Sequence, residues 1–323
     1  MTRHWTIGVD FGGTTIKCGL VDARGRVGRA LTLSTARYGR PDRFISGIDH
    51  AVRRLAQAAG VRVSALRGVG IGAPGSVDVA RGVVHSCVNV PGWRRVALRA
   101  RLERCLHRPV VVDNDVHCFT LGEWRFGAGR GSHDLIGLTL GTGVGGGLLL
   151  AGHLYRGTIG SAGEIGHMVI DSSGPRCGCG RRGCLEAHVG TRAIVAQARA
   201  LMRRQAGPLR RLAQAAHGRI SPELIGRAAR AGDRGARQLW DAFGHRLGIG
   251  LANLVNLVNP QRIVIGGGVT GSWPLFAPRM IRAIRENALR APAHAVQVVR
   301  AELADQAGIV GAAVLVWERN QSY

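Results

Sequence analysis

A short unit of an apolar strand, a glycine-rich turn and a second apolar strand occurs twice in this chain. The first copy is TIGVDFGGTTIKCGLVDARG at residues 6–25, and the second is LIGLTLGTGVGGGLLLAG at residues 135–152. Both patterns predict two short strands joined by a tight turn. The copies share few residue identities, so we interpret them as a repeat of architecture that begins each half of the chain.

The rest of the chain alternates between predicted strands and helices. Leu239, Phe243, Leu247, Leu251 and Val255 recur at every fourth position and form the apolar stripe of a long helix that Pro260 ends. Further strands are predicted in RGVGIGAPGS, PVVVDND, RIVIGGG and VQVVRAEL, and further helices at 44–58, 272–289 and 307–319. This alternation predicts an α/β fold with largely parallel sheets. No low-complexity linker separates the halves, so we expect two domains with a cleft between them.

Composition indicates the class of protein. The chain has 323 residues, of which 46% are hydrophobic, and this is enough for two core-forming domains. The N-terminus MTRHWTIGVD has no apolar leader, and the longest apolar run is too short and too interrupted by glycines to span a bilayer. Seven cysteines, an odd count, argue against a secreted disulfide scaffold. We therefore predict a soluble cytoplasmic protein.

The formal net charge of +24 is unusual and would ordinarily indicate nucleic acid, a membrane surface or a polyanionic substrate. Lys17 is the only lysine, and the arginines are spread along the whole chain. The densest basic stretch, residues 91–108, fits an amphipathic helix with a solvated face. We favour a compositional bias towards arginine over a dedicated binding surface.

Three glycine turns that follow predicted strands could approach phosphate groups. In Asp10–Thr15, DFGGTT, glycines give backbone N–H groups access to an anion and threonine hydroxyls add donors. Asp10 could hold a hydrated Mg²⁺ that accompanies a nucleotide. An ordinary β-turn is the alternative, and the sequence matches neither a Walker A loop nor the GxGxxG fingerprint.

The other two turns lie in the second half. LGTGVGGG at 140–147 is a second phosphate candidate, and Gly266–Gly268 suits the close approach of a flat adenine or its ribose. One such turn would be weak support. Three in this order are a much stronger indication of a nucleotide site.

Asn114 and Asp115 end the predicted strand PVVVDND. Phosphoryl transfer to an alcohol needs a carboxylate within hydrogen-bond reach of the attacking hydroxyl, and ligands of α/β proteins bind at the carboxyl ends of strands. Asp115 is therefore the candidate base. The alternative is that Asp115 or Asn114 only caps the helix that follows.

Cys177, Cys179 and Cys184 lie within eight positions in CGCGRRGC, a knuckle that can turn three thiolates to one point. With a histidine as the fourth ligand they would form a tetrahedral structural zinc site. His167 and His188 both lie close enough in the sequence to supply that ligand. Free thiols and a disulfide are the alternatives.

Taken together, these motifs resemble the ROK family of sugar kinases and repressors. The resemblance covers essentially the whole chain. Its most specific part is the glycine spacing that leads to GEIGH at 163–167 and then to the cysteine knuckle. The matching motifs, in order, are DFGGTTIK, GIGAPGSVD, NVPGW, DND, LGTGVGGG, GEIGH, CGCGRRGCLE and NLVNPQRIVIGGG.

The resemblance implies an actin-like ATPase (ribonuclease H-like) fold, with ATP in the cleft. The implied domains are residues 1–112, completed by a C-terminal helix at 305–323, and residues 113–304 with the zinc knuckle. Asp115 matches the catalytic base, and His167 matches both a sugar ligand and the fourth zinc ligand. The implied sugar-binding set is Gly75, Asn89, Asn114, Asp115, Glu164, His167 and Glu186. The implied nucleotide and phosphate set is Asp10, Gly12, Gly13, Thr14, Thr15, Lys17, Gly141, Thr142, Gly143, Gly267 and Gly268.

Two departures from the family pattern stand out. Thr15 occupies a position where many members have lysine, and the lysine falls at Lys17 instead. His117, Cys118 and Phe119 replace the small residues that usually follow the catalytic aspartate. We expect these bulky side chains to leave little room for a substituent on the sugar.

The resemblance implies an ATP-dependent kinase for the 6-hydroxyl of glucose, with structural Zn²⁺, with Mg²⁺ bound to ATP, and with a homodimeric or homotetrameric assembly. An N-acetylglucosamine or N-acetylmannosamine kinase is the alternative. A sugar-responsive repressor is a less favoured one, because the first strand begins by residue 6 and leaves no room for a preceding winged helix-turn-helix. A polyphosphate-dependent kinase is also less favoured, since such members generally differ around the knuckle.

Overall fold

The computed structural model of the protein describes residues 5–87 and 90–319. The chain forms two compact units. Unit 1 comprises residues 1–133, 147–163 and 301–323, and unit 2 comprises residues 134–146 and 164–300. The chain therefore passes between the units at 133/134, 146/147, 163/164 and 300/301. The domain boundaries expected from the sequence, at 112/113 and 304/305, stay a prediction.

Unit 1 is built on a five-stranded sheet with the strand order β3-β2-β1-β4-β8. The strands are β1 (Thr6–Phe11), β2 (Thr15–Val21), β3 (Val27–Ser34), β4 (Val69–Ala73) and β8 (Val110–Asn114). β1, β2 and β3 are antiparallel neighbours, as the first strand–turn–strand pattern predicts, whereas β4 is parallel to both β1 and β8. The carboxyl ends of β1, β4 and β8 consequently lie at the same edge of the sheet.

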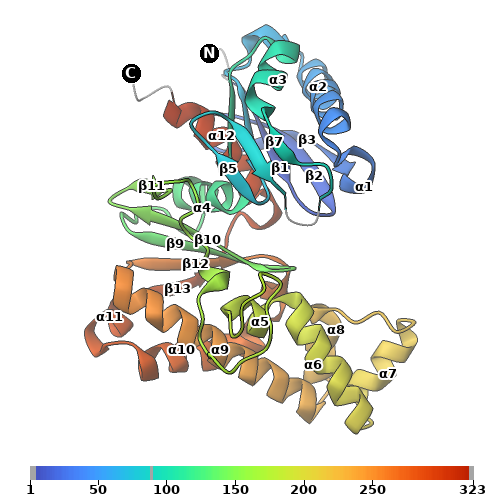
Figure 1. Ribbon diagram of the computed structural model, residues 1–323, viewed down its shortest axis with the longest axis vertical. Coiled ribbons are helices and arrows are strands. Elements are labelled where there is room, and N and C mark those ends of the chain that lie inside the picture. Colours follow the sequence, from blue (N-terminus) through green and yellow to red (C-terminus); the bar gives the residue numbers. More distant parts are fainter. Residues whose placement is uncertain (1–4, 88–89, 320–323) are drawn as a thin grey trace. The chain divides into compact units, whose positions relative to one another are not determined.

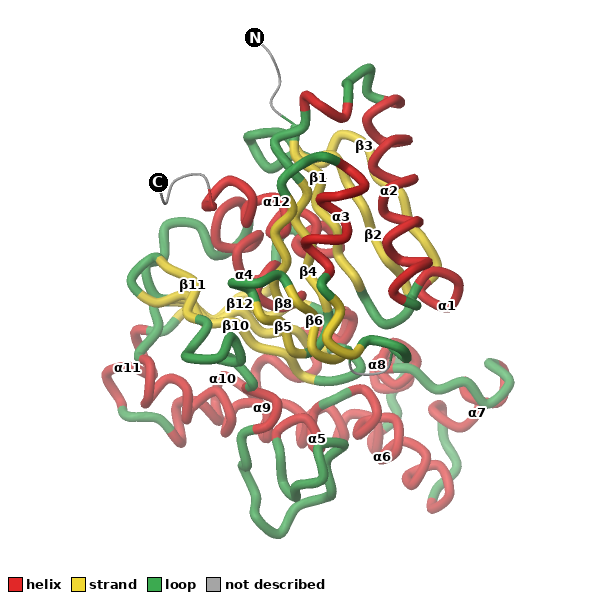
Figure 2. The backbone as a smooth tube through the Cα atoms, turned by 45° about the horizontal axis from the view of Figure 1, so that its top comes forward, coloured by secondary structure: helices red, strands yellow, loops and turns green. Residues whose placement is uncertain are grey.

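Helices cover both faces of this sheet (Figures 1 and 2). Helices α2 (Pro41–Ala58) and α3 (Leu98–Leu106) lie on one face, and α4 (Asp115–Phe126) and α12 (Ala307–Arg319) pack together on the other. Between the sheet and α2, the rings of Phe11, Phe44 and Trp93 pack within 5.3 Å of one another, centroid to centroid. On the opposite face, Gly8 and Gly70 allow the backbone of α12 to come close to the sheet. A Cβ atom on Gly70 would lie 1.6 Å from the carbonyl oxygen of Ala312.

The remaining elements of unit 1 are short. They are α1 (Thr35–Tyr38), η1 (Val63–Ala65), η4 (Ala304–Gln306) and a small sheet of β5 (Ser76–Asp78), β6 (Val83–Ser86) and β7 (Arg94–Val96). The single helix predicted across 91–108 is wrong at its start. Trp93 is buried and donates its indole N–H to the carbonyl of Gly39, and β7 follows it. The helix itself begins only at Leu98.

Unit 2 is built on parallel strands β9 (Leu135–Leu140), β12 (Arg262–Gly266) and β13 (Gln297–Arg300), with β12 between the other two. Strand β10 (Val144–Leu150) begins in unit 2 and continues into unit 1, where it pairs with β11 (His153–Tyr155). The helices of unit 2 are α5 (Leu185–Val189), α6 (Thr191–Arg204), α7 (Pro208–Ala215), α8 (Pro222–Arg230), α9 (Arg234–Val258), α10 (Trp273–Asn287) and α11 (Arg290–Ala295), with short η2 (Ile165–His167) and η3 (Gly268–Ser272).

The long predicted helix of the second half is α9. The Asp233 side chain accepts from the Ala236 amide at its start, and Asn259 adopts a left-handed conformation at its end, just before Pro260. Four members of the predicted stripe are buried, and α10 packs along the helix where Gly244 and Gly248 allow close approach. The α/β class expected from the sequence is confirmed. The expectation of largely parallel sheets is wrong, because the strand–turn–strand units pair antiparallel, as β1 does with β2 and β2 with β3. Within residues 5–87 and 90–319, no helix combines the length and apolarity needed to cross a membrane.

Candidate active site

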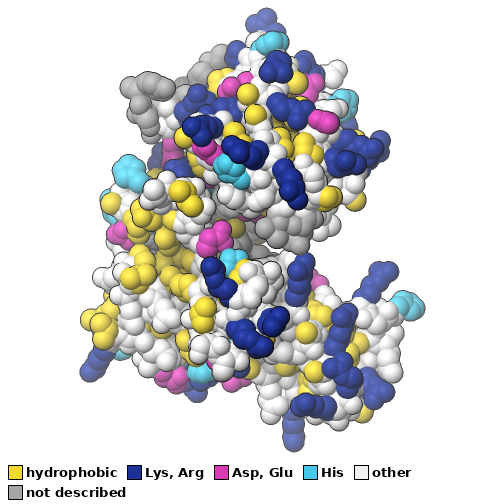
Figure 3. All heavy atoms as spheres, in the orientation of Figure 1, with side chains coloured by type: hydrophobic (Ala, Val, Ile, Leu, Met, Phe, Trp, Pro, Cys, Tyr) yellow, Lys and Arg dark blue, Asp and Glu magenta, His cyan; other side chains and the backbone are white. Residues whose placement is uncertain are grey.

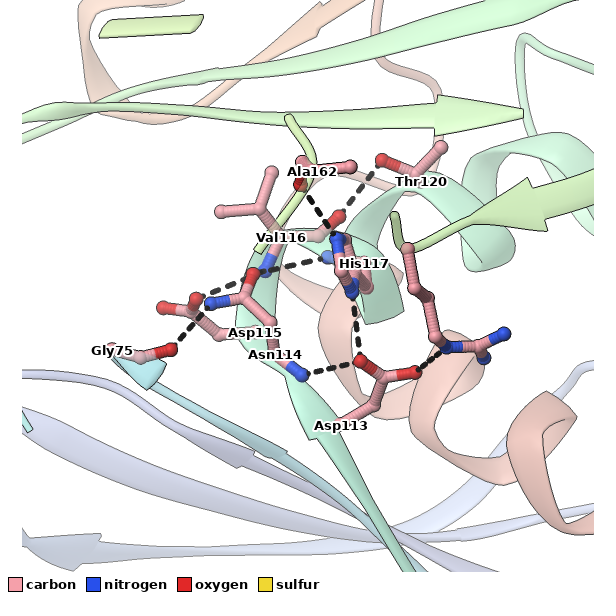
Figure 4. Close-up of polar contacts among 9 residues, drawn as sticks. Gly75, Asp113, Asn114, Asp115, Val116, His117, Thr120 and Ala162 are labelled. Atoms are coloured by element: carbon pink, nitrogen blue, oxygen red, sulfur yellow. Dashed lines mark hydrogen bonds and ion pairs between the residues drawn. The ribbon is translucent and has the colours of Figure 1, made fainter. Parts of the chain in front are cut away.

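Asn114 and Asp115 place two polar side chains at one strand end of unit 1. β8 ends at Asn114 and α4 begins at Asp115, so the two residues form the strand-to-helix junction (Figure 4). The Asn114 side-chain oxygen accepts from the amides of Val116 at 2.8 Å and His117 at 3.4 Å. Asn114 is therefore the helix cap, and this assigns the capping role that the sequence left open between the two residues.

Gly75 orients the other end of the Asn114 side chain. The Asn114 amide nitrogen donates to the carbonyl of Gly75 at 3.2 Å (Figure 4). Gly75 has a φ of 89°, in the left-handed region that favours glycine. Among the described residues the second N–H of the Asn114 side-chain amide has no acceptor, so it can donate to a bound group.

The Asp115 carboxylate has a different environment. Its Oδ1 accepts from the Val116 amide at 3.0 Å. Burial raises the pKa of Asp115 to about 7, and the charge of Asp10 adds to this rise. A carboxyl group that titrates near neutral pH can both accept and release a proton under ordinary conditions.

Asp10, at the end of β1, belongs to the same edge of the sheet. Burial raises its pKa to about 6, while the charge of Lys17 opposes this rise. Lys17 faces Asp10 across the β1–β2 ladder, and its ammonium group lies 3.3 Å from Asp305. The displaced lysine of the first turn thus still places its charge near Asp10.

The first glycine turn is a tight hairpin that two hydrogen bonds hold in place. The Gly12 amide donates to the Thr15 carbonyl at 2.9 Å, and the Thr35 hydroxyl donates to the Gly12 carbonyl at 2.8 Å. Gly13 and Thr14 at its tip are exposed. A Cβ atom on Gly13 would meet nothing within 4 Å, so the tip is open to an approaching group.

The other two glycine turns lie together in unit 2. They follow β9 and β12, which are parallel neighbours, and a Cβ atom on Gly267 would lie 2.2 Å from the Leu140 carbonyl oxygen. The Gly141 amide donates to the Gly143 carbonyl at 3.0 Å, and the Gly141 carbonyl accepts from Thr191 at the start of α6 at 3.0 Å. Gly268 is open, with nothing within 4 Å of its Cβ position.

Glu186 joins the glycine turn to the cysteine knuckle within unit 2. It lies in the first turn of α5, two residues after Cys184. Its Oε2 accepts from the Val144 amide at 2.9 Å, and its Oε1 lies 3.7 Å from the Cys177 sulfur. A Cβ atom on Gly143 would displace this carboxylate from its present position.

The knuckle brings four ligand atoms together. The donor atoms of His167, Cys177, Cys179 and Cys184 all lie within 4.8 Å of one another. The Cys179 and Cys184 sulfurs are 3.7 Å apart, and Nδ1 of His167 is 3.7 Å from the Cys177 sulfur. These four side chains can hold one metal ion.

The two histidines that compete for the fourth position have different surroundings. The Nε2 atom of His167 faces the Glu164 carboxylate at 3.9 Å, so its two nitrogens face the cysteines and the acidic residue respectively. His188 is buried with its Nδ1 atom 2.8 Å from Arg246. The cluster contains His167 and not His188, in agreement with what the resemblance implied.

The bulky residues after Asp115 do not crowd an open site. Cys118 and Phe119 are buried inside unit 1, where the Cys118 sulfur lies against Gly72 of β4. His117 is also buried and bonds to Asp113 and to the Ala162 carbonyl (Figure 4). The sequence predicts that these three side chains leave little room for a substituent on the sugar. Because they are buried inside unit 1, they give no steric reason for that expectation.

The candidate residues fall into one group in each unit. Unit 1 holds Asp10, Gly12, Gly13, Thr14, Thr15, Lys17, Gly75, Asn114 and Asp115, and unit 2 holds Gly141, Thr142, Gly143, Glu164, His167, Cys177, Cys179, Cys184, Glu186, Gly267 and Gly268. Asn89 lies outside the described residues. Sequence reasoning missed Asp113 and Arg156, although a carboxylate inside a β-branched strand was a signal for the first.

A comparison with protein families finds that the ROK family model matches residues 6–319. A glucokinase from Thermotoga maritima is 34% identical over 322 residues, which are 99% of this chain and 99% of that protein. A xylose repressor from Caldicellulosiruptor bescii is 31% identical over 269 residues, which cover 83% of this chain and 66% of the repressor.

Solved structures give a similar result. The crystal structure of a ROK family glucokinase from Streptomyces griseus, in complex with glucose and AMPPNP, superposes with a TM-score of 0.84 at 35% identity. The superposition covers 97% of this chain and 99% of that one.

Proposed function

The chain belongs to the ROK family, and we propose that it transfers the γ-phosphoryl group of ATP to the 6-hydroxyl of glucose. It has the actin-like ATPase fold of the ROK sugar kinases. The observation that carries the mechanism is Asp115, a carboxyl group with a pKa near 7 at the strand end where α/β proteins bind ligands.

In this proposal Asp115 is the general base. As the sugar 6-hydroxyl oxygen attacks the γ-phosphorus, its proton passes to the Asp115 carboxylate, and the bond from the γ-phosphorus to the bridging oxygen of ADP breaks. The glycine turns donate backbone N–H groups to the phosphates. Asp10 would hold the Mg²⁺ that accompanies ATP through a carboxylate oxygen.

We assign sugar recognition to two groups of residues. Asn114 donates one side-chain N–H to Gly75 and has a second to offer, while Glu164, His167 and Glu186 lie beside the metal cluster. Gly75 orients Asn114, and Asn89 is included by family resemblance. A buried polar group that loses its partner costs about 1–3 kcal/mol, so such a set can discriminate between sugars.

We propose that the cluster holds a structural zinc ion. Two thiolates bound to one tetrahedral zinc at ~2.3 Å lie ~3.8 Å apart, and the Cys179–Cys184 sulfur separation of 3.7 Å fits this spacing. The ion would neutralise thiolates beside Glu186 and fix the turn that carries His167. With four protein ligands it would serve a structural role and would not bind substrate.

The repressor alternative receives no support from the charge. On the face shown in Figure 3, Lys and Arg side chains are scattered over both units without forming one basic patch. A cytoplasmic location, expected from the composition, and a homodimeric or homotetrameric assembly, implied by the family resemblance, stay predictions.

We predict that Asp115→Asn lowers kcat roughly 10²-fold or more while glucose and ATP still bind, because only the proton acceptor is lost. In the wild-type protein, kcat/KM for glucose should fall below about pH 7, where Asp115 becomes protonated. This acidic limb is measured in steady-state kinetics across pH.

Stability provides the control for this variant. The folded-state pKa of Asp115 lies above its ordinary value, so its charge destabilises the fold progressively as pH rises from about 4 to about 7. Asp115→Asn should therefore melt no lower than the wild type at pH 8, and Asp49→Asn, which removes a surface pair with Arg53, should keep full activity. A large loss of melting temperature with normal kcat would show that Asp115 is only structural.

Metal analysis should find about one zinc ion per chain, and Cys179→Ser should lose it. Thiolate–zinc binding typically contributes ~10 kcal/mol or more, so its loss should also raise the KM for glucose. Cys105→Ser, at an exposed cysteine of unit 1, is the matched control and should retain zinc. A metal-free protein with an unchanged KM would contradict the proposal.

A coupled assay over a panel of hexoses and aminosugars tests the substrate. We expect kcat/KM for glucose to exceed that for N-acetylglucosamine by about tenfold or more, because an acetamido group must displace one of the matched hydroxyl contacts. Equal or reversed values would overturn the preference for glucose but leave the family assignment intact.

A further inference from the structure

Asp113 is a buried carboxylate two positions before the proposed base, and the chemistry above does not use it. Its side chain has no exposed surface. Burying an ionised carboxylate is costly unless donors and opposite charges compensate. Its partners should therefore indicate what it does.

Three donors face this carboxylate. Its Oδ1 accepts from the backbone amide of Asn114 and from Nδ1 of His117, both at 2.7 Å. Its Oδ2 accepts from Nε of Arg156 at 2.8 Å. Burial alone would raise the pKa of Asp113, but the hydrogen bond and charge of His117, together with Arg156, hold it below the ordinary value. Asp113 is thus an ionised acceptor with both oxygens engaged.

His117 extends the network to a second backbone segment. Its Nε2 lies 3.2 Å from the Ala162 carbonyl oxygen, while Nδ1 faces the carboxylate (Figure 4). A carbonyl and a carboxylate are both acceptors, so both ring nitrogens need an N–H to satisfy them. His117 therefore links the Asp113 carboxylate to the Ala162 backbone.

The segment reached in this way, residues 156–162, is held at both ends. Arg156 binds Asp113 at its start, the Ala162 carbonyl faces His117 at its end, and the Ala162 amide donates to the Arg156 carbonyl at 3.0 Å. Between these points residues 157–159 are exposed, with Ile159 79% exposed. The chain leaves unit 1 at 163/164, directly before Glu164.

We propose that Asp113, His117 and Arg156 are positioning residues for phosphoryl transfer, which tie segment 156–162 to the strand end that carries Asn114 and Asp115. This role rests on the proposed function. Arg156 is 43 positions from Asp113 in the sequence. Their contact therefore fixes the start of segment 156–162 relative to the proposed base, and the chain continues from this segment to Glu164. Small displacements of reacting groups can cost up to about 10²-fold in rate.

The test compares Arg156→Ala with Arg156→Lys and with a matched arginine. Arg156→Ala should lower kcat/KM for glucose about tenfold or more while the KM for ATP stays within about twofold. Arg156→Lys keeps the charge without the fixed guanidinium geometry and should recover part of the loss. Arg101→Ala removes another ion pair of unit 1, with Asp42, and should change neither constant.

Hydrogen exchange gives a readout that does not depend on turnover. Amides of residues 157–162 should exchange faster in Arg156→Ala than in the wild type. His117→Asn keeps a donor near Asp113 but cannot reach Ala162, so it should accelerate the same amides and lower kcat/KM for glucose. A purely structural role would lower the melting temperature without changing glucose kinetics well below it.

The outcomes separate the two levels of the proposal. If the wild-type protein phosphorylates glucose but folded Arg156→Ala matches it in kcat/KM and in exchange of 157–162, the positioning role is overturned and the proposed function stands. If the wild type phosphorylates no hexose, the proposed function fails, and the positioning role fails with it.

Discussion

The packing of α4 against α12 is the contact on which the reactive end of unit 1 depends. A Cβ atom on Gly311 would lie 1.6 Å from the Cys118 carbonyl oxygen, and one on Gly122 would lie 2.3 Å from the Ala307 carbonyl oxygen. The two backbones therefore touch directly, and no other residue fits at either position without displacement. Because α4 begins at Asp115, this packing also fixes where the proposed base lies on the sheet.

Helix α4 also anchors the chain near three of the points where it passes between the units, at 300/301, 133/134 and 163/164. The buried Glu123 carboxylate accepts from the amides of Glu302 and Leu303, and the Trp124 indole donates to the Ser132 carbonyl at 2.9 Å. His117 contacts Ala162 next to the third. The helix that begins with the proposed base thus also holds the segments that lead to the residues proposed for sugar and nucleotide binding.

The sequence predicted what local patterns determine and missed what distant contacts determine. The strand–turn–strand units, the α9 stripe and the cysteine spacing follow from short-range periodicity and ligand type, and the structure has the corresponding elements. The Asp113–Arg156 pair spans 43 positions and two elements, so no local pattern could reveal it. The helix predicted at 91–108 was wrong for a related reason, since burial of Trp93 against Gly39 overrides local helical spacing. Likewise, the direction of Cys118 and Phe119 depends on packing inside unit 1, which residue size does not indicate.

The central claim is that Asp115 takes the proton of the sugar 6-hydroxyl. It is tested most directly by a crystal structure of the wild-type protein with glucose and a non-hydrolysable ATP analogue. The account predicts an Asp115 carboxylate oxygen within about 3 Å of the glucose 6-oxygen, with that oxygen directed at the γ-phosphorus. A glucose molecule bound with its 6-hydroxyl away from Asp115 and facing another acid or base would contradict it.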